Sequence, residues 1–62
     1  MSATIRWLRV REGMTQGELA KKAQVTQGYI SQLEAGTKKR IGAAIAIRLA
    51  AALGVSVTEL LG

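Results

Sequence analysis

The sequence contains no cysteine, no histidine and no proline, and only four of its 62 residues are acidic. Without cysteine the chain has no disulfide and no thiolate chemistry. Without histidine it cannot by itself supply a histidine metal ligand or a histidine general base. The scattered carboxylates form no pair suited to general acid–base catalysis. We therefore expect a protein that is not an enzyme and that holds neither a metal nor a cofactor.

Basic residues outnumber acidic ones by nine to four, which gives a net charge of +5. This bias favours a polyanionic partner, nucleic acid ahead of an acidic membrane surface, although solubility alone is the other explanation. The longest apolar stretch, residues 41–53, is interrupted by Arg48 and is shorter than the ~20 residues that span a bilayer. The N-terminus lacks the apolar run of a secretory signal. We expect a cytoplasmic protein with no membrane partner.

Local start and stop signals divide the chain into helices. The capping-box patterns "TQGE" (15–18) and "SVTE" (56–59) begin two of them, and Thr26 is a third N-cap. Glycines that favour a left-handed helix end follow three segments: Gly13, Gly36 and Gly54. No stretch alternates with period two. The prediction is an all-α fold with five helices at about 3–12, 16–23, 27–35, 41–53 and 57–61, in one domain over residues 1–62.

Apolar residues at helical spacing predict the core. The first three helices supply Ile5, Leu8, Leu19, Ala20, Ala23, Ile30 and Leu33, and Val25 fills the gap between the second and third. The fourth helix has a predicted core set of Ala43, Ala46, Ile47, Ala50 and Leu53, with a second apolar strip formed by Ile41, Ile45 and Ala52. For Trp7, packing on the last helix and partial exposure both remain open.

The second and third predicted helices are joined by only about three residues, 24–26. So short a link makes the helices cross steeply and requires a small residue at their contact, which Ala20 supplies. Two helices joined in this way form a helix-turn-helix, whose second helix can enter the major groove of DNA.

From Leu8 to Leu61 the chain resembles the phage repressor and Cro-like, or lambda-repressor-like, helix-turn-helix family. The matching segments are "LRVREGMTQGELAKKA", "VTQGYISQLEAG" and "LAAALGVSVTELL". The resemblance implies a compact five-helix fold with the helix-turn-helix at helices 2 and 3, and binding to double-stranded DNA. It leaves the operator sequence open.

The chain departs from the family pattern at three positions. Gln24 replaces the usual glycine of the turn, where positive φ would cost a non-glycine residue on the order of 1 kcal/mol. Ile41 replaces a frequent proline. Gly28 lies within the third predicted helix, the recognition helix of the family, where it costs roughly 0.5–1 kcal/mol relative to alanine. Two alternatives remain open for this glycine: evolutionary drift, or close approach of the backbone to DNA.

The exposed side of the third predicted helix is the candidate base-reading surface. If Ile30 and Leu33 face the core, the opposite side is uncharged, unlike an ordinary solvated helix. A glutamine carboxamide matches the N6/N7 edge of adenine, and a serine hydroxyl can bond several bases. An ordinary polar surface is the alternative. We expect base contacts from Gln27, Gly28, Ser31 and Gln32, with the two glutamines foremost.

Affinity is expected to come from contacts to phosphates. Gln16 begins the second helix, where free N–H groups can hold a phosphate, and in the resembling family a glutamine here clamps the DNA backbone. For Tyr29, a phosphate contact and a packing role both remain open. The expected phosphate contacts are Gln16, Thr26, Tyr29, Lys38, Lys39 and Arg40.

Two charged residues are expected to be structural. Arg9 falls among the core positions of the first helix, and Glu34 follows Leu33 at the end of the third. The resembling family often pairs an arginine and a glutamate at these places. We predict an Arg9–Glu34 ion pair that ties the first helix to the recognition helix.

Small DNA readers of this type gain affinity by pairing on a palindrome. We expect a homodimer with contacts from Val57, Leu60 and Leu61, for which capping the core is the alternative role. The predicted function is a transcription regulator that represses by occluding a promoter, with activation through polymerase as the alternative. A competing hypothesis is a protein-interaction module, of antitoxin or adaptor type, that binds a protein partner through helices 4 and 5.

Overall fold

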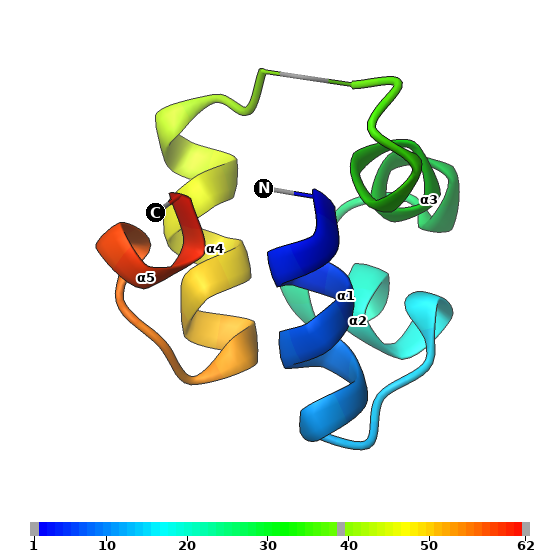
Figure 1. The fold of residues 1–62 in the computed structure, drawn as a ribbon, viewed down its shortest axis with the longest axis horizontal. Coiled ribbons are helices and arrows are strands. Elements are labelled where there is room, and N and C mark those ends of the chain that lie inside the picture. The colour runs from blue at the N-terminus through cyan, green and yellow to red at the C-terminus, as the bar shows by residue number, and fades with distance from the viewer. Residues whose placement is uncertain (1, 39, 62) are drawn as a thin grey trace.

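The computed structural model describes residues 2–38 and 40–61, and this part of the chain forms five helices and no strand. They are α1 (Ser2–Arg11), α2 (Gln16–Ala23), α3 (Gln27–Ala35), α4 (Ala43–Leu53) and α5 (Val57–Leu61) (Figure 1). The predicted all-α fold is confirmed. The helix predicted from residue 41 begins at Ala43, because Gly42 is its extended N-cap residue.

The predicted capping residues form the helix ends. Thr15 and Glu18 make a complete capping box: the Glu18 N–H donates to Thr15 Oγ1 at 3.1 Å, and the Thr15 N–H donates to Glu18 Oε1 at 2.8 Å. Thr26 Oγ1 accepts the Tyr29 N–H at 3.1 Å at the start of α3. Each cap satisfies backbone groups that a free helix end would leave unpaired.

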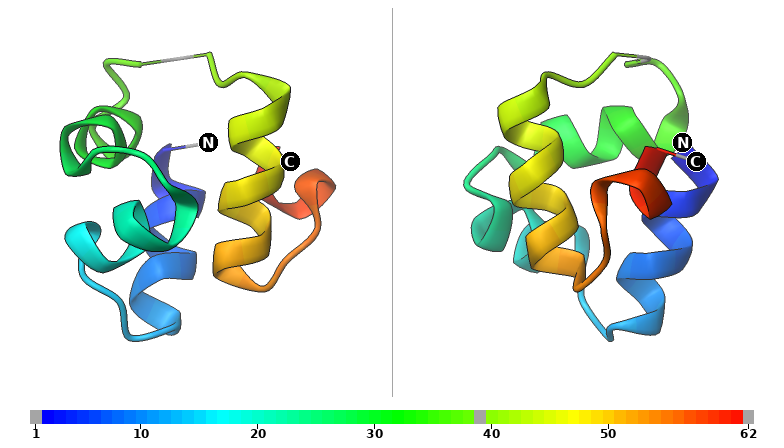
Figure 2. Two further views of the ribbon diagram at one scale, coloured as in Figure 1. Left: turned by 180° about the vertical axis from the view of Figure 1, so that it is seen from behind. Right: turned by 90° about the vertical axis from the view of Figure 1, so that its left-hand side faces the viewer.

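The helices enclose one aliphatic core. α2 packs against α3 and α4, α1 packs against α3, and α5 packs against α4. α1 and α5 lie at the front in Figure 1, and the view from behind in Figure 2 brings α4 forward. Every fully buried residue in the described part of the chain is apolar, and α1, α2 and α3 bury the residues that the sequence predicted.

The buried face of α4 differs from the prediction. Leu49 and Ala52 are buried, whereas Ala43 is exposed and Ile47 is 60% exposed. Because α4 packs against both α2 and α5, its buried stripe is broad and lies at a different rotation about the helix axis.

Trp7, whose place the sequence left open, is 63% exposed. None of the described helices has the length and apolarity to cross a membrane.

Candidate nucleic-acid interface

The link between α2 and α3 is a tight turn with a left-handed residue. Gln24 ends α2 with φ +61°, and its backbone N–H bonds to the carbonyls of Ala20 and Lys21. The Val25 N–H donates to the Ala20 carbonyl at 2.9 Å, and the Val25 side chain packs against the core. The positive φ expected at this position is present, carried by a glutamine.

A side chain from α4 also supports this turn. Arg48 Nε donates to the carbonyl of Ala23, the last residue of α2, at 2.9 Å. That carbonyl belongs to the last turn of the helix, which has no partner further along α2. Arg48 therefore ties the helix-turn-helix to α4.

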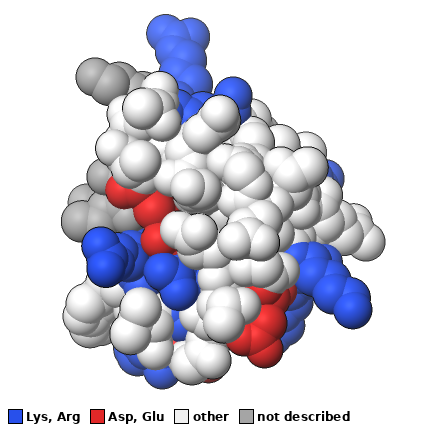
Figure 3. Space-filling model, turned by 90° about the vertical axis from the view of Figure 1, so that its right-hand side faces the viewer, with Lys and Arg blue, Asp and Glu red and all other residues white. Residues whose placement is uncertain are grey.

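The outer side of α3 is neutral and polar. Ile30 and Leu33 are buried, so the opposite side of the helix is turned outward. Gln27, Gly28, Ser31 and Gln32 are all exposed there. Figure 3 shows this side of the molecule with a broad uncharged area, basic side chains around and below it, and two smaller acidic patches. The four candidate base-contact residues are thus together on one accessible surface, the α3 outer face.

Two glycines bear on the α3 outer face. A Cβ built on Gly28 would meet only Thr26 Oγ1, at 3.9 Å, so the packing of the chain itself does not require a glycine there. A Cβ built on Gly17 would lie 3.3 Å from Gln27 Oε1, which places the Gln27 carboxamide over the first turn of α2. Gly17, which was not among the predicted site residues, makes room for this carboxamide.

The residues around Thr26 form one margin of this face. Thr26 is exposed and its oxygen accepts the Tyr29 N–H, so its hydroxyl hydrogen is directed elsewhere. Tyr29 is half-buried against the core, and Lys38 Nζ lies 5.2 Å from the centre of its ring. This distance is typical of a cation–π contact. Packing of Tyr29 therefore holds Lys38 beside the α3 outer face. Arg40 is exposed, and Lys39 lies outside the described residues.

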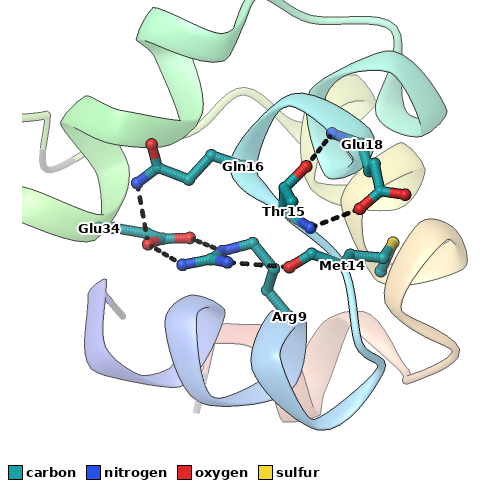
Figure 4. Close-up of polar contacts among 6 residues, drawn as sticks. All are labelled: Arg9, Met14, Thr15, Gln16, Glu18 and Glu34. Atoms are coloured by element: carbon teal, nitrogen blue, oxygen red, sulfur yellow. Dashed lines mark hydrogen bonds and ion pairs between the residues drawn. The ribbon is translucent and has the colours of Figure 1, made fainter.

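The predicted Arg9–Glu34 ion pair is present and joins α1 to the end of α3 (Figure 4). Arg9 Nε and Nη2 donate to the two carboxylate oxygens of Glu34 at 2.6 and 2.9 Å, and Arg9 Nη1 donates to the Met14 carbonyl at 2.9 Å. Gln16 Nε2 donates to Glu34 Oε1 at 3.1 Å. The candidate phosphate-binding glutamine is thus held in place by the same carboxylate.

The environment of this pair favours the charged forms of both residues. Burial by itself raises the pKa of Glu34, but the hydrogen bonds from Arg9 and Gln16 and the charges of Arg9 and Arg6 outweigh it, so the pKa lies below its usual value. The hydrogen bond to Glu34 raises the pKa of Arg9. The pair stays ionised at neutral pH.

A recess of about 320 Å³ opens beside this network. Its lining consists of Arg6, Arg9, Gln16, Ser31, Glu34 and Ala35. Arg6 was not among the predicted site residues. The signal that could have found it is its spacing of three from Arg9, which puts both on one side of α1.

The expected dimer contacts on α5 do not all lie on the surface. Leu60 is fully buried and belongs to the core, so its assignment to an interface is wrong for this structure. It is buried because α5 packs against α4 and turns this residue inward. Val57 is half-buried against the core, and Leu61 is 50% exposed.

Comparison with known proteins places this geometry among regulators. The family profile described as helix-turn-helix matches residues 5–60. The fold is similar to that of the biofilm master regulator SinR in complex with DNA, with a TM-score of 0.93 and 31% identity over 98% of this chain and 100% of that one.

Two further solved structures are similar. The N-terminal DNA-binding domain of SinR from Bacillus subtilis has a TM-score of 0.88 and 31% identity, over 100% of this chain and 90% of that one. The clp gene regulator ClgR from Corynebacterium glutamicum has a TM-score of 0.88 and 37% identity, over 97% of this chain and 63% of that one.

Proposed function

The chain belongs to the helix-turn-helix family and is a DNA-binding transcription regulator, and from this premise we propose that it represses by binding a palindromic operator as a homodimer. In this proposal α3 lies in the major groove and reads the sequence. The proposed action is occlusion of a promoter in the cytoplasm, without catalysis.

The observation that supports this function most directly is the α3 outer face. Gln27 and Gln32 are both exposed on it and neither carries charge. A carboxamide can donate to N7 and accept from N6 of adenine only when it is correctly oriented, so it discriminates between bases. An uncharged side chain adds little affinity for the wrong base. We propose Gln27 and Gln32 as the main base contacts, with Ser31 and the backbone at Gly28 beside them.

Groups around the α3 outer face are suited to hold phosphates. We propose Gln16, Thr26, Lys38 and Arg40, together with the predicted Lys39, as backbone contacts, and Tyr29 mainly as the support of Lys38. Such contacts fix the register of the protein on the duplex and supply most of the affinity. In this proposal the neutral side chains of α3 read the sequence, and the surrounding phosphate contacts, three of them cationic, supply most of the affinity.

The small size of this surface supports the proposed homodimer. Half-sites about one helical turn apart present two α3 helices to the same side of DNA. We propose Leu61, with the half-buried Val57, as the centre of the interface, because Leu61 is the large apolar side chain of α5 that the fold leaves outside.

Selection from a random pool of short duplexes at two salt concentrations tests this function. We expect a palindrome to be enriched, and expect the enrichment to disappear for Gln27→Ala and Gln32→Ala. Thr58→Ala, a change at an exposed polar residue of α5, is the control and should retain it. Binding without enrichment would contradict sequence reading, and no binding at low salt would contradict DNA recognition altogether.

Two exposed apolar side chains favour a second candidate function, the protein-interaction module. Ile47 on α4 is 60% exposed and Leu61 on α5 is 50% exposed. A stable complex with another protein, disrupted by Ile47→Glu and accompanied by no affinity for any duplex, would support it over the regulator.

A further inference from the structure

The recess between α1 and α3 lies next to the α3 outer face and has no role so far. Ser31 belongs to both, since it lines the recess and lies one helical turn from Gln27. Gln16 enters the recess from the start of α2, and Arg6 enters it from α1. A duplex docked on α3 would bring its sugar-phosphate backbone over this side of the protein.

The charge of the recess is positive and comes from one residue. Arg9 and Glu34 neutralise each other through two hydrogen bonds, and Arg9 Nη1 donates to the Met14 carbonyl. Arg6 is exposed and, among residues 2–38 and 40–61, forms neither an ion pair nor a hydrogen bond. Its guanidinium is therefore available to a ligand.

Two neutral donors accompany Arg6. Gln16 Nε2 uses one N–H on Glu34 Oε1, which leaves its second N–H for another acceptor. Ser31 contributes an exposed hydroxyl. A guanidinium with two neutral donors is a set of groups that suits the oxygens of a phosphodiester.

We propose that this recess binds one phosphate of the DNA backbone, with Arg6 supplying the charge and Gln16 and Ser31 the neutral hydrogen bonds. In this proposal the Ser31 hydroxyl donates its hydrogen to the phosphate, and only its oxygen remains free to accept from a base. The proposal rests on the proposed DNA-binding function and adds Arg6 to it. It also gives the Arg9–Glu34 pair a second role. Without Arg9, the negative charge of the Glu34 carboxylate would repel a phosphate at this place. By neutralising that charge, Arg9 allows the recess to bind an anion.

The test compares Arg6→Gln with Arg11→Gln. Both changes remove one exposed positive charge from α1, but Arg11 lies over the Trp7 ring, pairs with Glu12 and does not line the recess. Dissociation constants for the selected duplex would be measured by fluorescence anisotropy over a range of salt concentrations. Arg6→Lys, which keeps the charge, is a further variant.

We expect Arg6→Gln to lower the slope of log affinity against log salt by about 0.9, the value for one lost phosphate contact. Between about 50 and 200 mM salt, its affinity should then fall roughly threefold to fourfold less than that of the wild type. Arg11→Gln and Arg6→Lys should keep the wild-type slope. An unchanged slope for Arg6→Gln, or an equal drop for Arg11→Gln, would overturn the proposal.

Replacing single phosphates by neutral methylphosphonates locates the contact. At one position in each half-site the wild type should lose clearly more affinity than Arg6→Gln, which keeps only the hydrogen bonds from Gln16 and Ser31 to that phosphate. If every position affects both proteins equally, the recess holds no phosphate even though the protein binds DNA. A wild type that binds no duplex would instead overturn the proposed function and this site together.

Discussion

Arg9 and Glu34, 25 residues apart in the chain, form a bidentate ion pair with N–O distances of 2.6 and 2.9 Å. Their side chains are 13% and 5% exposed. Because the carboxylate also accepts from Gln16, the pair connects α1, the start of α2 and the end of α3. The recognition helix is thus fixed to the rest of the domain by charged hydrogen bonds as well as by its apolar side.

Removing one partner of this pair should destabilise the fold strongly. Arg9→Met should lower the free energy of unfolding by about 3 kcal/mol, because it leaves a nearly buried carboxylate without its cation. Urea denaturation would measure the change. The double variant Arg9→Met with Glu34→Leu should recover most of the loss, and a single variant as stable as the wild type would contradict the structural role of the pair.

Stability should fall in acid through Glu34. Its pKa lies below the usual value in the folded protein, so its contribution is complete above the unfolded pKa of about 4.3 and is lost as the pH falls through the folded pKa. Hydrogen bonds to Thr15 likewise lower the pKa of Glu18. Urea midpoints between neutral pH and strong acid should decline less steeply for Glu34→Gln than for the wild type. Parallel declines would contradict this assignment.

Gly17→Ala should raise the stability of the fold and weaken base recognition by Gln27. Alanine raises helix stability by up to about 0.5–1 kcal/mol. Its Cβ would lie 3.3 Å from Gln27 Oε1, so the Gln27 carboxamide must move by a few tenths of an ångström. Thermal melting should show the gain. Binding to single-base variants of the operator should show weaker discrimination at the base pair read by Gln27 and no change at that read by Gln32. Equal loss at both would contradict a local effect.

Gln24→Gly should stabilise the turn. Gln24 has φ +61°, which strains an L-residue by about 1 kcal/mol, although the greater freedom of glycine in the unfolded chain offsets part of the gain. We expect a net increase of up to about 1 kcal/mol in chemical denaturation. The opposite change at Gly54, which has φ +72°, is the control: Gly54→Ala should destabilise. If Gln24→Gly is less stable than the wild type, the Gln24 side chain contributes more to stability than its positive φ costs.

Leu61→Glu should weaken assembly of two protomers on a palindrome. Burying a leucine contributes about 1.5–3 kcal/mol, so its replacement by a charge should reduce dimer affinity about tenfold or more. Sedimentation with and without the duplex would measure it. Ile47→Glu makes the same change at the exposed apolar residue of α4. If only Ile47→Glu weakens assembly, the interface lies on α4 instead of α5.

The helices and their ends could be predicted from the sequence because their causes are local. A capping box such as Thr15–Glu18 acts over three residues, and the apolar spacing of Ile30 and Leu33 repeats within one helical turn. The short link with Val25 then defined the helix-turn-helix, and the neutral α3 face followed from which residues the core takes. The sequence by itself therefore determined the fold class and which side of the protein we propose to read DNA.

Other features depend on how separate helices pack, and local patterns do not encode that. The sequence predicts Leu60 as a dimer contact at the surface, but α5 packs against α4 and buries it. The sequence predicts Ile47 as a core residue, but the orientation of α4 leaves it exposed. Arg6 becomes a candidate contact only because α1 lies beside α3 and encloses a recess with Gln16. Tertiary structure alone decided these places, because each arises where residues distant in sequence meet.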